Sequence, residues 1–377
     1  MRILIATVTA GAGHVQAAAA LEEAWKALRP RDSVQRLDVL DFAPKLYRKV
    51  YVEGYIKLVE HAPDLWALVF KKTDNPALMR KLARLRRTLG RFTTGKFARR
   101  VSTTRPDAVL CTHFMPLEIL GAVRRQRKGN SKPPFVVSVV TDFEAHALWM
   151  DPDADLYCVA QEETKAGLVA RGVPSDRVVA TGIPVAAKFS QPIEVQSVRK
   201  RNGWRDDLPI VLVLSGGFGM GPVREVLEQL DGASGEFQVV VVCGKNEELR
   251  RELATRNPRR PTHVLGFVTN MHELMAASTL ILTKPGGLTC SEALALGKPL
   301  VLLNPIPGQE AANSDFLLEH GAAVKVNRLE ELPFRIEKLL APGRLQSVAA
   351  AARQIGRPQA APDVCVEVLR RLKSRQD

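Results

Sequence analysis

The feature that most constrains the fold is an alternation of short apolar strands with helical stretches, and this pattern occurs twice. Strands are expected at 2–8, 34–37, 108–111, 135–140 and 156–159, and again at 210–214, 239–242, 263–264, 280–282 and 300–303. Strands that are apolar throughout and separated by helices are typical of parallel sheets covered on both faces. The sequence therefore predicts an α/β protein with two doubly wound parallel sheets in tandem.

The pattern restarts after Thr181-Gly182-Ile183-Pro184, which indicates two domains. A chain of 377 residues is also longer than one domain of about 150 residues. We expect an N-terminal domain over 1–185 and a C-terminal domain over 186–354, with a polar linker region at 184–208. The helical segment 355–377 is expected to pack back on the first domain.

Composition excludes several classes of protein. No apolar run approaches the ~18 residues of a membrane-spanning helix, and the segment 3–8 is too short for a signal peptide. The five cysteines are scattered, which favours a reduced, cytoplasmic compartment. The seven histidines form no spacing typical of a metal site, so no metal is expected.

A glycine-containing loop follows the first strand of each half. The first is Gly11-Ala12-Gly13-His14, and the second is Ser215-Gly216-Gly217-Phe218-Gly219-Met220-Gly221. Such loops let backbone N–H groups and a helix N-terminus face an anion. The second loop lacks the Lys-Ser/Thr of a P-loop, which disfavours an ATPase. For the first loop, a purely structural turn with an exposed His14 remains an alternative.

Titratable side chains follow three strands of the first half. His14 follows the first strand, Thr112-His113 another, and Thr141-Asp142 with His146 a third. Because open α/β sheets place reactive groups at the carboxyl ends of parallel strands, we expect these side chains to face one cleft.

Two further segments suggest a sugar nucleotide. In Thr283–Leu294, Gly286-Gly287 forms a loop, Thr289 can cap a helix, and the Glu292 carboxylate can accept two hydrogen bonds from a ribose diol. In Asn304–Asn313, Gln309, Glu310 and Asn313 offer polar groups to a hexose. The alternatives are an acidic residue that complements the helix dipole and an N-capped surface helix.

The positive charge is concentrated in one segment. Residues 71–105 contain twelve Lys and Arg but one acid, Asp74, which gives +11 of the net +14. Aromatic residues in 46–70 adjoin it. This combination suits an anionic membrane surface; nucleic acid and a merely solvated helical face are the alternatives.

These motifs, in this order along nearly the whole chain, resemble one family. They are Gly11-Ala12-Gly13-His14, Thr112-His113, Thr141-Asp142-Phe143 with His146 and Trp149, Thr181–Val185, Lys284-Pro285-Gly286-Gly287 through Glu292, and Pro307-Gly308-Gln309-Glu310 with Asn313. The series resembles the monogalactosyl- and processive glucosyl-diacylglycerol synthases. These are GT-B glycosyltransferases, with two Rossmann-like domains facing a cleft, related to the N-acetylglucosaminyltransferase that forms lipid II.

The resemblance implies an inverting transfer of glucose or galactose from UDP-glucose or UDP-galactose to diacylglycerol, without a cofactor or metal. It implies His14 as general base, with Asp142 as the second choice. It assigns the donor site to Gly217, Phe218, Gly219, Gly221, Phe267, Val268, Met271, Gly286, Gly287, Thr289, Glu292, Gln309 and Glu310. The loop Gly217–Gly221 with Thr289 would hold the diphosphate. Phe267, Val268 and Met271 would hold the uracil, Glu292 the ribose, and Gln309 and Glu310 the hexose.

Acceptor and membrane contacts are expected in the first half. The residues are Gly13, His113, His146, Trp149, Tyr51, Trp66, Lys71, Lys72, Arg84 and Arg87. The protein is expected to lie on the cytoplasmic face of the membrane, bound to anionic lipids. The alternatives are a GT-B enzyme with another lipid acceptor, a UDP-sugar epimerase and, last, a nucleic-acid-binding protein; no nucleic acid is expected.

Overall fold

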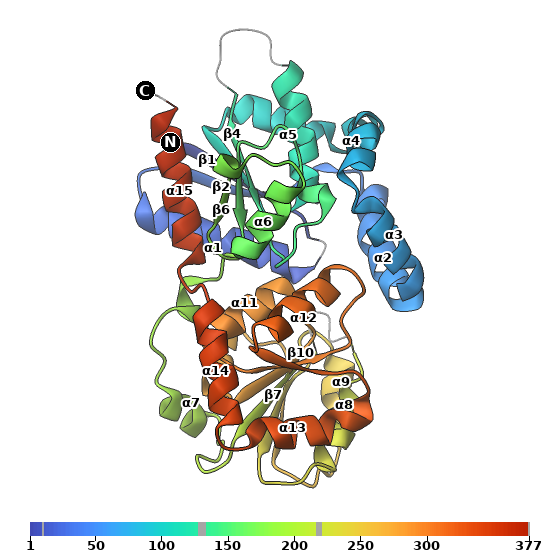
Figure 1. Cartoon of the computed structure of the whole chain (residues 1–377), viewed down its shortest axis with the longest axis vertical. Helices are drawn as coiled ribbons and strands as arrows, with labels where there is room; N and C mark the ends of the chain where they lie inside the picture. The colour runs from blue at the N-terminus through green and yellow to red at the C-terminus, as the bar shows by residue number, and fades with distance from the viewer. Residues whose placement is uncertain (10, 127–132, 216–220, 376–377) are drawn as a thin grey trace. The chain divides into compact units, whose positions relative to one another are not determined.

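The computed structural model of the chain describes residues 1–9, 11–126, 133–215 and 221–375. Within these ranges the structure describes the backbone but not the side chains of residues 52, 53, 55–57, 60, 80, 82–94, 122, 125 and 126. The chain forms two compact units (Figure 1). Unit 1 comprises Met1–Ala187, Ile306–Gln309 and Gln359–Asp377, and unit 2 comprises Lys188–Pro305 and Glu310–Pro358.

Unit 1 contains a six-stranded parallel sheet in the order β2-β1-β3-β4-β5-β6. Its strands are β1 (Arg2–Thr7), β2 (Ser33–Asp38), β3 (Ala108–Cys111), β4 (Phe135–Val139), β5 (Leu156–Val159) and β6 (Val178–Ala180). In β1, Leu4 and Ala6 join one buried cluster while Ile3 and Ile5 join another. This alternation shows that both faces of the sheet are covered, which is why the strands are apolar throughout.

Helices cover both faces of the unit 1 sheet. On one face α1 (Ala12–Leu28) packs against α15 (Ala360–Ser374), and Trp25 and Leu21 meet Val364 and Val368 in a shared cluster. The other face carries Phe97 and Val101 of α4 (Pro76–Thr104), residues of α5 (Phe114–Gln126), and Leu168 of α6 (Glu162–Ala170). The last helix of the chain is thus part of the N-terminal unit's core (Figure 1).

The basic segment and the residues before it form three helices. These are α2 (Lys45–His61), α3 (Pro63–Thr73) and α4. The prediction of helix over 45–100 is confirmed, but Pro63 and Pro76 begin new helices, as expected for a residue that fits the first helical turn and not the interior. Among the described residues, no helix is both long and apolar enough to cross a bilayer.

Unit 2 repeats the architecture with the strand order β12-β11-β10-β7-β8-β9. All five pairings are parallel. The strands are β7 (Ile210–Leu214), β8 (Gln238–Val242), β9 (Thr262–Leu265), β10 (Leu280–Thr283), β11 (Leu300–Leu303) and β12 (Ala323–Val326). The helices are α7 (Val195–Arg201), α8 (Val223–Asp231), α9 (Glu247–Ala254), α10 (Met271–Ala277), α11 (Gly287–Ala295), α12 (Gln309–Glu319), α13 (Leu332–Leu340) and α14 (Arg344–Ile355).

The strand order reverses direction once in each sheet. In unit 1 the reversal lies between β1 and β3, and in unit 2 it lies between β7 and β10. In open α/β sheets, ligands bind outside the carboxyl ends of the strands at such a switch point. In unit 1, His14 follows β1 and His113 follows β3. In unit 2, the second glycine loop follows β7 and Gly286-Gly287 follows β10.

The sequence interpretation of 184–208 as a linker region was incomplete. This stretch includes a 3-10 turn at Ala187–Phe189 and the helix α7. Val198 of α7 and Trp204 are buried, and Arg199 donates to the carbonyls of Leu208 and Ala277. The polar composition that suggested a linker belongs to the exposed face of a short helix that packs on unit 2.

Candidate functional site

The first site surrounds His14 at the switch point of unit 1. Gly11, with φ of 111°, ends the turn that starts α1, and this places His14 in the first turn of the helix. The His14 Nδ1 lies 2.8 Å from the backbone oxygen of Thr112 and 2.9 Å from Oγ1 of Thr141. The Thr112 hydroxyl donates to the His14 carbonyl oxygen at 2.9 Å. Loops after β1, β3 and β4 therefore meet at one imidazole.

The contact with Thr112 determines which nitrogen of His14 can act as a base. A backbone oxygen can only accept, so the proton of the neutral ring resides on Nδ1 and the lone pair on Nε2. Among the hydrogen bonds of the described residues, none involves Nε2 of His14. Burial lowers the pKa of His14 from 6.5 to about 4, against the opposing effect of the Thr112 hydrogen bond. The ring is therefore neutral at pH 7.

Aromatic rings enclose the imidazole of His14. The ring centre of His113 lies 4.8 Å away, and that of Trp149 lies 6.4 Å away. His113 is buried, accepts from the Met115 N–H at 3.1 Å, and has its pKa lowered well below 6.5 by burial and by His14. The structure thus brings together His14, His113 and Trp149, with Gly13 in the same helical turn.

Asp142 and His146 lie in the loop between β4 and β5, which also carries Trp149. Asp142 is half-buried and follows Thr141, the residue that contacts His14. Both ring nitrogens of His146 contact the protein's own backbone: Nδ1 accepts from Leu148 and Nε2 donates to the Phe70 oxygen. A direct role for His146 in binding the acceptor remains a prediction.

The second site lies at the switch point of unit 2. Gly286 precedes α11, Gly287 begins it, and Thr289 and Glu292 lie in its first two turns. Burial raises the pKa of Glu292 from 4.5 to about 8, while the positive charge of Lys188 opposes this shift. At pH 7 this carboxyl group is therefore mostly protonated, and hydrogen bonds donated to it by a ligand would favour its charged form. Nearby, Asn313 on α12 donates to the Pro285 oxygen at 3.1 Å.

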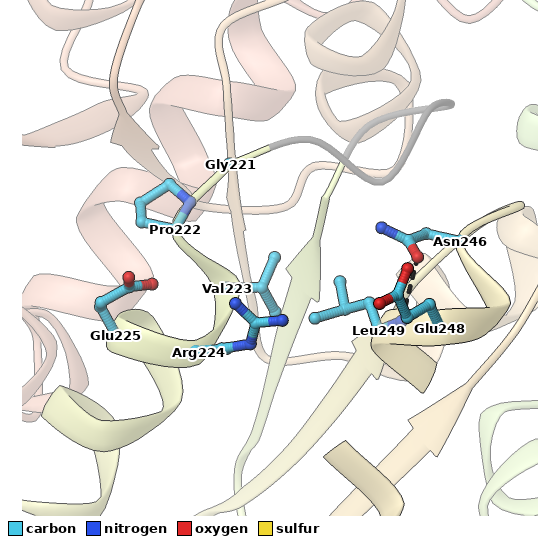
Figure 2. Close-up of a pocket in the computed structure, with 8 residues that line it drawn as sticks. All are labelled: Gly221, Pro222, Val223, Arg224, Glu225, Asn246, Glu248 and Leu249. Carbon is cyan, nitrogen blue, oxygen red and sulfur yellow. Dashed lines mark hydrogen bonds between the residues drawn. The ribbon is translucent and has the colours of Figure 1, made fainter. Parts of the chain in front are cut away.

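A pocket lies beside Gly221, the last residue of the second glycine loop (Figure 2). It has a volume of about 280 Å³ and is lined by Gly221, Pro222, Val223, Arg224, Glu225, Asn246, Glu248 and Leu249. The N-terminal ends of α8 and α9 contribute to it, and the Asn246 side chain caps α9 by accepting from the Leu249 N–H at 3.0 Å. Residues Gly217, Phe218 and Gly219 lie outside the described part of the chain, so Gly221 is the described member of that predicted set.

The remaining predicted donor residues occupy two loops of the chain. Phe267 is 65% exposed, with the Lys245 ammonium 5.9 Å from its ring centre. Val268 is half-buried in the loop before α10, and Met271 is half-buried at the first residue of that helix. Gln309 and Glu310 are half-buried in the first turn of α12. Sequence reasoning missed Lys188, whose ammonium donates to the Thr269 oxygen at 3.0 Å in the same loop as Phe267. A lone lysine inside the predicted linker region 184–208 gave no signal.

The predicted membrane residues lie on α2, α3 and α4. Tyr51 packs against the core cluster of unit 1, and Trp66 packs against Phe70 with ring centres 5.9 Å apart. Lys71 and Lys72 are exposed in the last turn of α3. Arg84 and Arg87 belong to α4, but their side chains are outside what the structure describes. Among the side chains that the structure describes on α2 and α3, the large apolar ones that are exposed are Leu46, Val50, Leu65, Leu68 and Val69.

Metal ligands are not grouped in the described part of the chain. Among those residues, no set of three or more His, Cys, Asp or Glu side chains is placed to hold a metal ion.

Two α/β units with reactive or glycine-rich loops at each switch point define a protein of the GT-B class, and solved structures share this fold. MurG of Acinetobacter baumannii matches with a TM-score of 0.62 at 18% identity, over 98% of this chain and 99% of that chain. Anabaena Alr3699/HepE in complex with UDP-glucose matches with a TM-score of 0.56 at 16% identity, over 98% and 99%. A Neisseria meningitidis UDP-GlcNAc 2-epimerase bound to UDP-GlcNAc matches with a TM-score of 0.61 at 14% identity, over 98% and 100%.

Sequence similarity identifies the family. The family model of monogalactosyldiacylglycerol (MGDG) synthase matches residues 14–185, and that of the glycosyltransferase family 28 C-terminal domain matches residues 210–363. Processive diacylglycerol beta-glucosyltransferases of Bacillus cereus and Bacillus thuringiensis are 31% identical over 98% of this chain and 93% of theirs. The chain belongs to this family of diacylglycerol glycosyltransferases. The resemblance and the fold class predicted from the sequence are both confirmed.

Proposed function

We propose that the protein transfers a hexose from a UDP-sugar to diacylglycerol with inversion at the anomeric carbon. The observation that carries this proposal is the 31% identity over 98% of the chain to proteins named processive diacylglycerol beta-glucosyltransferases. The two switch points support it, because one presents a histidine base and the other a set of helix N-termini suited to a nucleotide diphosphate. The fold alone does not separate a transferase from an epimerase, since solved structures of both share it.

In this proposal His14 is the general base. Its Nδ1–H is directed to the Thr112 oxygen, so Nε2 accepts the proton of the acceptor hydroxyl as that hydroxyl attacks the anomeric carbon. A pKa of about 4 keeps Nε2 unprotonated at neutral pH. The protonated ring formed in the step is stabilised by the hydrogen bond to Thr112. Asp142 is the second choice, because it lies one residue from Thr141 in the adjoining loop.

Unit 2 is proposed to hold the UDP-sugar. Glu292 accepts the ribose hydroxyls, and the glycine loop 216–221 with Thr289 and the N-termini of α8 and α11 stabilises the diphosphate as it departs. Phe267, Val268 and Met271 surround the uracil, with Gly286 and Gly287 allowing close approach. Gln309 and Glu310 bind the hexose hydroxyls. Amides and helix N-termini supply the stabilisation in this scheme, so no metal or cofactor is required.

The acceptor is proposed to reach His14 from the cytoplasmic face of an anionic membrane. On α2 and α3, Leu46 is 74% exposed and Leu65 is 52% exposed, beside exposed Lys71 and Lys72. Exposed leucines next to lysines suit the boundary between lipid head groups and acyl chains. Gly13, His113 and Trp149 would then line the place of the acceptor hydroxyl.

The experiment is incubation of the purified protein with labelled UDP-glucose or UDP-galactose, each with vesicles that contain diacylglycerol and anionic phospholipid. We expect labelled glycolipid with one of the two donors, undiminished by EDTA. Label confined to the aqueous phase with both donors would contradict the proposed function, and loss of product with EDTA would contradict the metal-free scheme.

A further inference from the structure

The loop 141–149 between β4 and β5 forms one wall of the His14 site. At its start, Oγ1 of Thr141 lies 2.9 Å from Nδ1 of His14. At its end, the ring of Trp149 lies 6.4 Å from the rings of both His14 and His113. Any displacement of this loop would therefore move both the hydroxyl that contacts the base and the indole that encloses it.

The middle of the same loop is bonded to the C-terminal end of α3. The Nε2 of His146 donates to the Phe70 oxygen at 3.0 Å, and the two rings lie 4.3 Å apart. The Ala147 N–H donates to Oδ1 of Asp74, the residue that ends α3, at 2.7 Å. Two successive residues of the loop are thus held by the helix that carries exposed Leu65 and Leu68.

Arg171, at the end of α6, completes this cluster. It donates to the Asp74 carboxylate at 2.5 Å through one nitrogen and to the Ala145 oxygen at 2.8 Å through another. Both side chains of the ion pair are shielded, with 23% of Arg171 and 29% of Asp74 exposed. A charged pair that is half-buried and shares its groups with two backbone partners is held more firmly than an exposed surface pair.

The sequence context of Asp74 is unusual. It is the one acid in a segment, 71–105, that contains twelve basic residues. In the structure this carboxylate is directed at Arg171 and the loop, rather than at the lysines next to it on α3. The ion pair with Arg171 spans 97 residues of sequence, so its effect is to attach α3 to the rest of unit 1.

We propose that Asp74 and Arg171 are positioning residues of the acceptor site, which tie the loop 141–149 to α3. α3 is the proposed lipid-contacting helix. The contacts of Asp74 and Arg171 therefore make the position of the loop 141–149 beside His14 depend on the position of α3. This inference rests on the proposed function. Its specific consequence is that loss of the Asp74 or Arg171 contacts reduces hexose transfer while lipid binding and UDP binding persist.

The test compares Asp74→Ala and Asp74→Asn with Asp64→Ala, which removes the same charge from the opposite end of α3. Four quantities are measured for each protein: kcat for transfer with diacylglycerol vesicles, vesicle binding by flotation, the Kd of UDP, and hydrogen exchange of residues 141–149. For Asp74→Ala we expect kcat to fall by about tenfold to a hundredfold, the range for a displaced active-site wall. Vesicle binding and the Kd of UDP stay within about twofold of wild type.

Asparagine is expected to give an intermediate result, because its amide oxygen still accepts from Ala147 while the charge opposite Arg171 is lost. Amide exchange at 145–148 should accelerate in the order wild type, Asp74→Asn, Asp74→Ala. Arg171→Lys provides a second test if an Asp74 variant does not fold. It keeps the charge but replaces the two guanidinium nitrogens that bond Asp74 and Ala145 separately with one ammonium on a different stem, and it should also lower kcat.

Two outcomes are distinguishable. A wild-type protein that transfers no hexose overturns the proposed function and this inference with it. A wild-type protein that transfers hexose, with Asp74→Ala and Arg171→Lys at the wild-type kcat or no lower than Asp64→Ala, overturns the inference alone. Unchanged exchange at 145–148 in Asp74→Ala would also overturn it.

Discussion

The Nδ1 atom of His14 lies 2.8 Å from the backbone oxygen of Thr112, a residue 98 positions further along the chain. This contact fixes the proton on Nδ1 and leaves Nε2 as the basic nitrogen. Because the partner is a backbone atom, no side-chain substitution of Thr112 removes the contact. Substitutions that can alter the first site are therefore those of His14 itself and of Thr141.

Replacement of His14 by alanine should lower kcat for transfer by about a hundredfold to ten-thousandfold, the range attributed to a general base. The Kd of UDP, which belongs to unit 2, should not change. Thr141→Val should cost less, because the Thr112 oxygen still orients the ring. Labelled-lipid assays and calorimetry with UDP measure both quantities. Wild-type activity in His14→Ala would show that His14 is not the base and would leave Asp142 as the candidate.

The lowered pKa of His14 predicts a stability change in acid. The folded value of about 4 is below the ordinary 6.5, so as pH falls below 6.5 the unfolded chain takes up a proton first. The contribution of this group is complete above pH 6.5 and declines until pH 4, by about 3 kcal/mol in all. Urea unfolding at pH 7 and pH 4.5 should show a smaller decline for His14→Gln than for wild type. Equal declines would contradict the assignment.

Glu292→Gln should weaken UDP binding by roughly tenfold or more, since the amide offers one acceptor oxygen where the carboxylate offers two to a buried diol. The same variant should be more stable than wild type at pH 9. The folded pKa of about 8 exceeds the ordinary 4.5, so the wild-type carboxyl loses stability as pH rises from 4.5 to 8. Glu319→Gln, on the exposed end of α12, is the control. Calorimetry and thermal melts at pH 5 and pH 9 test both parts.

Gly221→Ala should impair UDP binding through backbone conformation. Its φ of 122° is strained for a residue with a side chain, whereas the nearest atom to an added Cβ is Cε of Lys284 at an ordinary 3.8 Å. We expect about 1–2 kcal/mol of strain and a weaker Kd for UDP. Gly203→Ala, also at positive φ but with no atom near the added Cβ, should lower stability and leave the Kd unchanged. An unaltered Kd in Gly221→Ala would remove this turn from the donor site.

Leu65→Asp with Leu68→Asp should release the protein from anionic vesicles. Each exposed leucine that enters the lipid boundary contributes about 1–2 kcal/mol, so losing both should weaken vesicle binding by about thirtyfold to a thousandfold. Leu28→Asp, an exposed leucine at the end of α1, is the matched control and should leave binding unchanged. Flotation of both proteins with vesicles measures the difference. Equal binding would move the membrane surface away from α3.

The strands were predictable because their residues are buried on both faces. The strands at 108–111, 156–159, 210–214 and 300–303 match the prediction residue for residue. The three-residue strand β6 and the mixed strand β12, Ala323-Val324-Lys325-Val326, gave no comparable signal. The sequence also did not indicate α5, in which Pro116 interrupts the helical pattern, or α7 within the polar region before β7.

Part of the candidate site was predictable because the carboxyl ends of parallel strands lie at one edge of the sheet. His14, His113 and Thr141 could be grouped from their places after β1, β3 and β4. Contacts that depend on tertiary packing could not be predicted. The pairs Asp74–Arg171 and Lys188–Thr269 are 97 and 81 residues apart, and neither belongs to a motif.

The most direct measurement is the ratio of UDP released to hexose recovered in the lipid phase, with wild-type protein, the active UDP-hexose and diacylglycerol vesicles. We expect one UDP released for each hexose transferred, with β configuration in the glycolipid. Release of UDP with free hexose and no glycolipid, or conversion of the UDP-sugar to an epimer without release of UDP, would contradict the proposed transfer.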